Sequence, residues 1–205
     1  MTVHTEPATL APLDERGRAA LFTDARTANT FAPVPVTDEE LREVYDLAKM
    51  GPSAANLQPL RVLFVRTPEA KEELAGHMSE GNRAKTRSAP AVAVLAWDTR
   101  FHEHVPTVFP IRPEMQDALE ADPGMREGMG RFSATLQIGT FILAVRAAGL
   151  AAGPMAGFDA AGIDAAFFGD GRWRTLLVVN IGHPGAGAWF DRLPRLDAEA
   201  AVAWA

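Results

Sequence analysis

Apolar and polar residues recur along most of this chain with the period of an α-helix. The clearest case is TDEELREVYDLAKMG, residues 37–51, in which Thr37 and Glu40 have the spacing of a capping box. Apolar side chains then return every three or four residues until Gly51, which can end a helix. The same reasoning predicts helices over residues 14–26, 68–74, 131–149 and 159–168.

Three shorter segments have the composition of buried β-strands. They are LRVLFVR at 60–66, APAVAVLAWD at 89–98 and TLLVVNIG at 175–182. Helices outnumber these strands and separate them irregularly. We therefore expect an α+β fold and not a doubly wound parallel sheet.

The helix predicted over residues 131–149 is apolar on most of its faces. Gln137 and Arg146 interrupt the apolar stretch, which favours a buried helix over a membrane span. A helix that is apolar on so many sides does not suit the surface of a monomer. We therefore expect part of it in a subunit interface.

Two segments are expected to lack regular structure. Residues 1–12 have the character of a loose N-terminal arm. Residues 99–130 contain four prolines and little periodicity, which is typical of a functional lid or of a mobile excursion without a role. The 205 residues show no internal repeat and no low-complexity linker, so residues 1–205 are expected to form a single domain.

Composition and charge restrict the class of protein. An apolar fraction of 47% and a charged fraction of 22% are typical of a soluble globular chain. The net charge of −6 argues against a general binder of nucleic acid or anionic membranes. The N-terminus has no basic segment followed by an apolar one, so no secretion signal is predicted and a cytoplasmic location is expected.

Several common site types are missing from the sequence. There is no cysteine, which excludes disulfides, thiolate metal ligands and cysteine nucleophiles. No P-loop, G-x-G-x-x-G turn, H-E-x-x-H or G-x-S-x-G motif occurs. We expect the HEH at 102–104 to place two imidazoles on one side of a strand, but no third ligand is in sight and no metal site is predicted.

Five short polar segments remain as candidate functional sequence. Taken alone, each has an ordinary explanation: a frayed helix end, a solvated turn, a solvated helix face, a strand-to-helix connection capped by Asp159, and an exposed pair of arginines. In chain order the segments are ARTANTF at 25–31, GPSAANLQP at 51–59, GNRAK at 81–85, GPMAGFDAAG at 153–162 and RLPRLDAEAAV at 192–202.

In order and spacing, these segments together resemble the FMN-dependent nitroreductase family, and the resemblance covers nearly the whole chain. Its most specific part is the P-S-x-x-N-x-Q-P pattern at 52–59. The family's N-x-x-K, P-x-x-G-F-D and R-L-x-x-E-x-x-V patterns are matched at 82–85, 154–159 and 195–202. Leu60 stands where the family often has tryptophan.

The resemblance implies a mixed, mainly antiparallel sheet surrounded by helices, in an intertwined homodimer with FMN at the subunit interface. It implies that the loop at 51–59 lies against the flavin bound mainly by the other subunit. Arg26, Thr27 and Arg195 would meet the ribityl phosphate. Asn82 would bond the pyrimidine edge, and Lys85 would offset negative charge gained on reduction.

The turn at 154–157 would present backbone N–H groups of Ala156 and Gly157 to N5 and O4 of the flavin ring. The chemistry is implied to be carried by FMN, with NADH or NADPH as hydride donor, and no catalytic side chain is assigned. The residues implied to bind the cofactor are Arg26, Thr27, Asn29, Pro52, Ser53, Ala54, Asn56, Gln58, Asn82, Lys85, Pro154, Met155, Ala156, Gly157, Arg192 and Arg195.

At finer grain, the segments LFTDART, APAVAVLAWD, GPMAGFD and RLPRL look like the malonic semialdehyde reductase subgroup. That subgroup reduces the aldehyde to 3-hydroxypropionate in pyrimidine degradation. Arg112, and after it Arg131, are the candidate partners for the substrate carboxylate. Two alternatives stay open: a broad NAD(P)H nitroreductase or quinone reductase, and a non-catalytic flavin-binding or flavin-storage protein.

Overall fold

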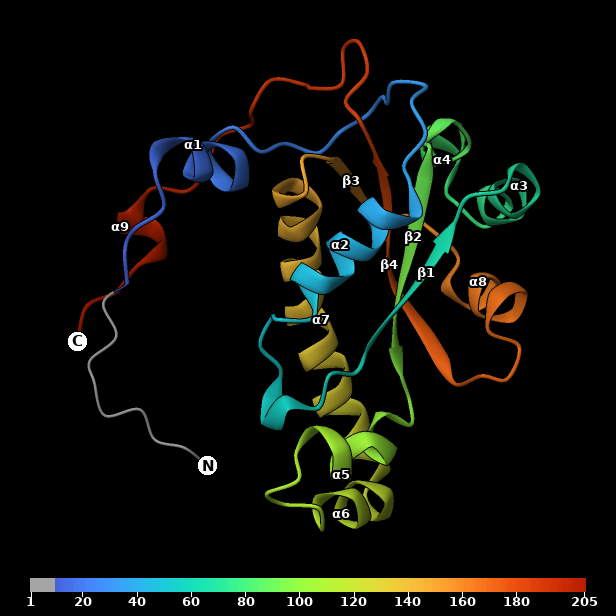
Figure 1. Ribbon diagram of the computed structural model, residues 1–205, viewed down its shortest axis with the longest axis vertical. Coiled ribbons are helices and arrows are strands. Elements are labelled where there is room, and N and C mark those ends of the chain that lie inside the picture. Colours follow the sequence, from blue (N-terminus) through green and yellow to red (C-terminus); the bar gives the residue numbers. More distant parts are fainter. Residues whose placement is uncertain (1–9) are drawn as a thin grey trace.

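Residues 10–205 are described by the computed structural model in Figure 1, so most of the predicted N-terminal arm lies outside the described residues. In chain order the elements are α1 (Glu15–Arg18), η1 (Ala19–Thr23), α2 (Asp38–Ala48), η2 (Ala54–Asn56), β1 (Leu60–Val65), α3 (Pro68–Gly76), α4 (Glu80–Ser88), β2 (Ala91–Asp98), η3 (Phe101–His104), α5 (Val105–Val108), α6 (Met115–Ala121), α7 (Pro123–Ala147), β3 (Ala151–Met155), α8 (Ala160–Phe167), β4 (Trp173–Gly182) and α9 (Ala198–Ala201).

A four-stranded sheet in the order β1-β2-β4-β3 forms the centre of the fold. All three strand pairings are antiparallel, so the described sheet is purely antiparallel and not mixed. The three predicted strands are confirmed as β1, β2 and β4, and the α+β expectation is confirmed with them. The fourth strand, β3, was not predicted.

Side chains that alternate along β2 separate the core into two layers. Ala91, Ala93 and Leu95 pack with α2 and α7, whereas Val92 and Val94 pack on the opposite face against α3 and α8. Because successive side chains of a strand point to opposite faces, one fully buried strand supplies both layers. Figure 1 shows the resulting arrangement, with α2 and α7 on one side of the sheet and α3, α4 and α8 on the other.

The segment 99–130 is largely helical, so the prediction of an irregular insert is wrong. It contains η3, α5, α6 and the first two turns of α7. Three of its elements join a third apolar cluster through Phe101, Val105 and Leu119, together with Leu57 and Trp97 from the preceding chain. The segment is thereby packed as a small helical layer at one end of the sheet (Figure 1).

Capping explains where two of the helices begin. Thr37 and Glu40 form both hydrogen bonds of the predicted capping box at the start of α2. Asp159 accepts a hydrogen bond from the Gly162 N–H and caps α8, as predicted. The first helix is shorter than predicted: α1 begins behind Asp14, turns into the π-helix η1 and ends at Thr23.

The buried carboxylate of Asp98, on β2, pairs with arginines at the ends of the two strands beside it, β1 and β4. Asp98 is 1% exposed and lies between Arg61, at 2.8 Å, and Arg172, at 2.9 Å. Burial alone would raise its pKa, but hydrogen bonds from Arg172 and from the Arg100 N–H, with the nearby charge of Arg61, hold the pKa of Asp98 below its ordinary value.

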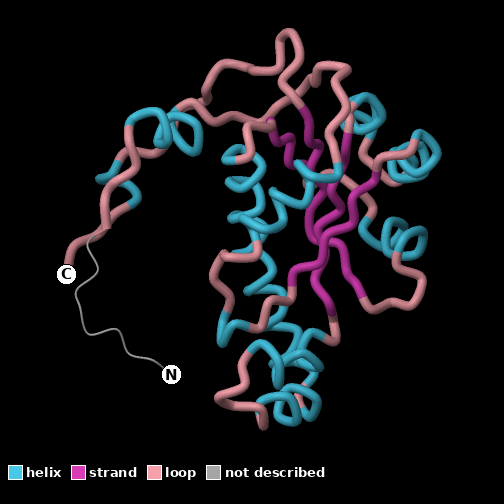
Figure 2. The backbone as a smooth tube through the Cα atoms, in the orientation of Figure 1, coloured by secondary structure: helices cyan, strands magenta, loops and turns pink. Residues whose placement is uncertain are grey.

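The two ends of the described chain run side by side away from the sheet, as Figure 2 shows. The Arg192 guanidinium donates to the carbonyl oxygens of Thr23 and Ala25, and Arg26 donates to that of Phe190. We call residues 10–27 and 189–205 the arms. In the part of the chain that is described, no helix is both long and apolar enough to cross a membrane.

Candidate functional site

Residues from both arms line one cavity of about 190 Å³. The residues are far apart in the sequence but are brought together because the arms run side by side. The backbone of Asn29 reinforces this arrangement, since its N–H donates to the carbonyl of Ala188. Five of the predicted cofactor residues are among those that line the cavity: Arg26, Thr27, Asn29, Arg192 and Arg195.

Three arginines line this cavity together with one carboxylate, Asp191, which forms no ion pair with them. Arg26, Arg192 and Arg195 donate hydrogen bonds to backbone carbonyl oxygens, and within residues 10–205 none of them forms an ion pair with a carboxylate. Such clustering is unusual for a chain with a net charge of −6. Planar guanidinium groups suit the oxygens of a phosphate, so the donor set fits a phosphate-bearing ligand.

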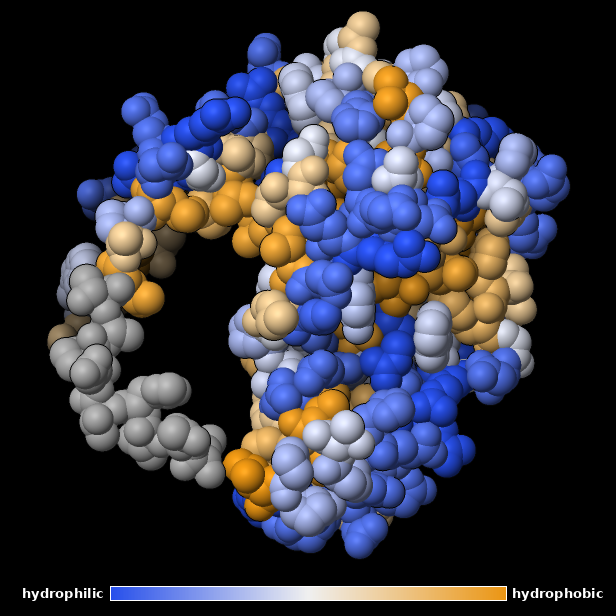
Figure 3. Space-filling view, in the orientation of Figure 1, coloured by the Kyte–Doolittle hydropathy of each residue, from blue (hydrophilic) through white to orange (hydrophobic). Residues whose placement is uncertain are grey.

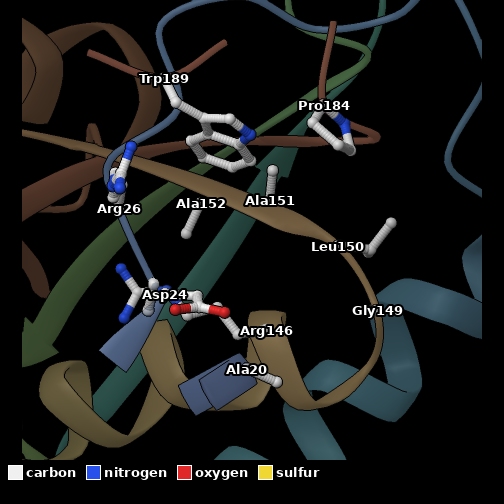
Figure 4. Close-up of a pocket in the computed structure, with 11 residues that line it drawn as sticks. Ala20, Asp24, Arg26, Arg146, Gly149, Leu150, Ala151, Ala152, Pro184 and Trp189 are labelled. Atoms are coloured by element: carbon white, nitrogen blue, oxygen red, sulfur yellow. The ribbon is translucent and has the colours of Figure 1, made fainter. Parts of the chain in front are cut away.

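A second cavity of about 330 Å³ adjoins the first and shares Arg26 with it. Figure 4 shows the Trp189 ring on one side of this cavity, next to Ala151 and Ala152, and Arg146 on the opposite side of it. Burial lowers the pKa of Arg146, and the charge of Arg192 lowers it further. The Arg146 guanidinium donates to the Leu21 carbonyl oxygen at 3.5 Å.

The next predicted group lies between α4 and the turn that follows β3. Asn82 donates from Nδ2 to the Gly157 carbonyl oxygen at 3.0 Å, and the Ser79 N–H donates to the same oxygen at 3.0 Å. A Cβ at position 157 would lie 3.0 Å from both the Asn82 amide and the Ser79 hydroxyl, so glycine permits this close approach. Lys85, one turn along α4, is half-buried.

The turn at 154–157 exposes its backbone more than its side chains. Met155 is buried in the core, where its sulfur accepts from Asn180 at 3.7 Å. Pro154 is half-buried, and Ala156 is exposed. Asn82 therefore positions a turn whose outward-facing surface is mostly main chain.

The loop at 52–58 has a backbone conformation rare for L-residues. Ala55, Asn56 and Gln58 have φ angles of 48°, 54° and 46°. The Gln58 N–H donates to the Ser53 hydroxyl, and the Gln58 amide donates to Asn56 Oδ1. Pro52 and Ala54 carry no polar side chain. The polar side chains of Ser53, Asn56 and Gln58 all form hydrogen bonds within the chain.

The predicted site residues fall into two separate regions of one chain. Figure 1 shows the loop after α2 beside the lower half of α7, whereas α4 and the arms lie at the other end of the sheet. The structure joins the arm residues with one another, and Asn82 with the turn at 154–157. It does not join the loop at 52–58 to either group within one chain.

The two candidates for binding a substrate carboxylate differ in their surroundings. Arg112 is exposed and donates to Glu114 at 3.1 Å, two residues away. Arg131 lines a cavity of about 540 Å³ together with Arg126 and Arg174. Glu127 and Asp164 line the same cavity and pair with Arg131 at 3.7 Å and with Arg174 at 3.5 Å, so both candidate arginines already have an acidic partner.

The expectation for the two histidines of HEH is wrong. They lie in the 3-10 helix η3, not in a strand, and they point to different environments. His102 is buried and its Nε2 lies 2.5 Å from Glu120, whereas His104 is exposed. Within residues 10–205, no three His, Cys, Asp or Glu side chains are grouped closely enough to hold a metal ion.

Three polar residues of α7 were not predicted as functional. Arg146 and Gln137 were noted only as polar interruptions of an apolar stretch, and Ser133 was not noted at all. Their position inside an apolar stretch could have indicated a role, because a polar side chain inside a buried helix needs a hydrogen-bond partner. Their partners lie far away in the sequence, at Leu21, Leu60 and Ala54.

Comparison with known proteins gives a consistent family. A model of the Nitroreductase family matches residues 23–183. A Streptomyces coelicolor protein named as an NADH dehydrogenase/NAD(P)H nitroreductase is 60% identical over 91% of this chain and 93% of its own. A Leptothrix cholodnii protein of the same name is 45% identical over 93% of this chain and 97% of its own.

Solved structures share the fold at low sequence identity. A nitroreductase from Exiguobacterium sibiricum, in complex with FMN, has a TM-score of 0.80 at 19% identity and covers 97% of this chain and 100% of its own. An NAD(P)H:FMN oxidoreductase from Staphylococcus epidermidis has a TM-score of 0.79 at 20% identity and covers 96% of this chain and 98% of its own.

Proposed function

Because the chain belongs to the nitroreductase family, we propose that it is an FMN-dependent NAD(P)H oxidoreductase. The relatives named above are NAD(P)H nitroreductases, and one protein of the same fold was solved with FMN. Within the chain, the observation that carries the proposal is the cluster of arginines without acidic partners in the arms.

The residues present fit FMN at two places. Arg26, Arg192 and Arg195 would hold the phosphate, since none of them is neutralised by a carboxylate in the described part of the chain. The turn held by Asn82 would receive the ring, because Ala156 is exposed there and carries only a methyl side chain. When bound, FMN supplies the chemistry of accepting a hydride from NAD(P)H and passing electrons to an acceptor.

The chain's own contribution is to bind, orient and tune. Asn82 fixes the turn whose N–H groups would face the ring, and Lys85 places a positive charge on the same side of α4. That charge would offset the negative charge gained on reduction. No side chain of the described residues needs to act as a nucleophile in this account.

We further propose that two copies of the chain build each site. One chain keeps its loop at 52–58 apart from its arms and α4, so a second copy would bring a loop to them (Figure 1). Large apolar side chains are exposed where a partner would cover them: Phe132 and Leu136 on α7, with Phe22, Phe190, Leu193 and Leu196 in the arms. Figure 3 shows hydrophobic residues along the inner edge of the arms.

Dimer formation and FMN binding are then thermodynamically coupled. A ligand that binds only the dimer stabilises it against dissociation. We expect the holoprotein to remain dimeric at lower concentrations than the apoprotein. Sedimentation or mass photometry of both forms on dilution tests this, and identical dissociation would contradict a shared site.

For the acceptor, we propose malonic semialdehyde, which carries a carboxylate beside the aldehyde. The cavity around Arg131 is our first candidate for that carboxylate, because its lining has three arginines, Arg126, Arg131 and Arg174, against two carboxylates, Glu127 and Asp164. Arg112 remains a second candidate, although it pairs with Glu114 in the free chain. A broad nitro or quinone reductase is the alternative that needs no carboxylate partner.

One acceptor panel separates these proposals. The FMN-loaded protein is assayed with NADH and NADPH against malonic semialdehyde, a quinone and a nitroaromatic compound, in wild type and in Arg131→Ala and Arg112→Ala. The account predicts a raised KM only for the carboxylate-bearing aldehyde in the variant that removes its partner. Equal loss on all acceptors contradicts the carboxylate role. Tight FMN binding without turnover of any acceptor would favour a storage protein.

A further inference from the structure

The loop at 53–58 adopts a conformation that its sequence alone does not favour. Three non-glycine residues within four positions, Ala55, Asn56 and Gln58, lie in the left-handed region. In that region the Cβ of an L-residue crowds the backbone, and such residues persist only where the surroundings hold them. The loop therefore needs an external support.

Helix α7 supplies that support at both ends of the loop. The Ser133 hydroxyl accepts a hydrogen bond from the Ala54 N–H at 3.2 Å. The Gln137 side-chain carbonyl accepts one from the Leu60 N–H at 3.1 Å. Ser133 is 0% exposed and Gln137 is 3% exposed. The bond from Leu60 is buried, whereas the bond from the half-buried Ala54 is partly buried.

These contacts lie along one face of the helix. Ser133 and Gln137 are four residues apart, and Thr140 follows three residues later, so the three are neighbours on the helix surface. Thr140 packs against Gly51, where a Cβ would lie only 2.6 Å from its hydroxyl. A single stripe of polar side chains on α7 thus contacts the segment from 51 to 60.

The middle of the loop is held by the helical layer at the end of the sheet. Asn56 donates from Nδ2 to the Val108 carbonyl oxygen at 2.7 Å. Leu57 is 1% exposed and packs with Trp97 and Phe101. The loop is therefore anchored to its own subunit at both ends and in the middle, while Pro52 stays exposed.

We propose that Ser133 and Gln137 are positioning residues of the cofactor site. They hold the left-handed loop in the shape that it presents to the flavin of the second subunit, and neither side chain needs to touch FMN. The inference rests on the proposed function, because the loop is a flavin contact only by family resemblance. Loss of either acceptor would release one end of the loop, and loss of Gln137 would also leave the buried Leu60 N–H unpaired.

The test uses two variants and a matched control in the FMN-loaded dimer. Ser133→Ala removes the hydroxyl with little change in volume, and Gln137→Met keeps the length of the side chain without its acceptor. The control is Thr67→Ala, which removes the hydroxyl that caps α3 and accepts from the Ala70 N–H at 3.2 Å. All three are expected to lower the temperature of thermal unfolding.

The decisive readouts are the FMN dissociation constant and the visible circular dichroism of the bound flavin. Both report the flavin's surroundings, which loss of stability alone does not change. Ser133→Ala and Gln137→Met should each raise the dissociation constant on the order of tenfold, about 1.4 kcal/mol, and alter the dichroism. Thr67→Ala should leave both at the wild-type values.

Two results would overturn the inference. The first is wild-type FMN affinity and dichroism in both α7 variants, which would make their hydrogen bonds purely structural. The second is equal weakening in the Thr67→Ala control, which would assign the effect to general destabilisation. A wild-type protein that binds no FMN at all would instead remove the proposed function, and this inference with it.

Discussion

Arg195 is the arginine whose loss should affect the phosphate of FMN and little else. Among residues 10–205, its Nη1 donates only to the carbonyl oxygens of Leu193 and Pro194, its own neighbours, so Arg195→Ala removes no long-range hydrogen bond within that part of the chain. The stability of the fold should change by about 0.5 kcal/mol or less. A charge-assisted hydrogen bond to phosphate contributes about 1.5–3 kcal/mol, which corresponds to a roughly 10- to 150-fold weaker affinity for FMN.

Riboflavin makes this prediction selective, because it has the same ring and ribityl chain without the phosphate. Fluorescence titration of the apoprotein should show that Arg195→Ala weakens FMN and leaves riboflavin unchanged. Arg16→Ala, an exposed guanidinium on α1, is the control and should change neither. Arg192→Ala should weaken both flavins, since Arg192 also joins the two arms through Thr23 and Ala25.

The reasoning is refuted if Arg195→Ala weakens FMN and riboflavin equally. That result would mean that Arg195 shapes the arm and does not bind phosphate. An unchanged FMN affinity would equally remove Arg195 from the site. Added salt should reduce the difference between FMN and riboflavin in the wild type, because the contact is electrostatic and exposed.

Three further changes test other parts of the account. Lys85→Ala should lower the reduction potential of bound FMN, by about 30 mV for each tenfold loss of preference for the reduced form, and an unchanged potential would make Lys85 a binding contact only. Asp98→Asn should lower the free energy of unfolding by about 3–5 kcal/mol near neutral pH, because it leaves two arginines around a neutral group. The folded pKa of Asp98 is lowered, so its contribution to the free energy of unfolding is present above an unfolded pKa of about 3.9. That contribution is lost as pH falls through the folded pKa. Urea unfolding of wild type and variant should therefore converge in acid. Gly51→Ala should lower thermal stability by about 1–3 kcal/mol, because a Cβ there would meet the Thr140 side chain at 2.6–2.9 Å, and an unchanged melting temperature would contradict that close packing.

Local patterns predicted the elements whose signals are local. The Thr37–Glu40 capping box, the three apolar strands and the Asp159 cap are all contained in a few adjacent residues, and all are confirmed. Two of the four prolines in 99–130, Pro106 and Pro123, were misread as breaks, whereas Pro110 and Pro113 do lie between α5 and α6. Pro123 instead occupies the first turn of α7, where a missing N–H costs nothing.

Strand β3 was missed because its residues do not resemble a strand. AAGPM has no β-branched side chain, and it is held in the sheet by pairing with β4. Its position at the edge explains why Pro154 is tolerated. Tertiary pairing decided the structure of this segment, and single-sequence patterns do not contain that information.

The candidate site was predictable as a set of segments but not as an arrangement. Family-like spacing pointed to Arg26 and Arg195, which the arms bring into one cavity. It did not point to Ser133 or Gln137, whose partners are 79 and 77 residues away in the sequence. Sequence spacing identifies groups that face a ligand more readily than groups that hold other groups in place.

The central claim is that this chain binds FMN and moves electrons from NAD(P)H through it. The most direct measurement is the visible absorbance of the FMN-loaded protein during anaerobic addition of NADH or NADPH. The account predicts that the flavin band bleaches with a stoichiometric amount of at least one donor and returns when an acceptor is added. A band that neither donor bleaches, in protein that retains its FMN, would contradict the claim.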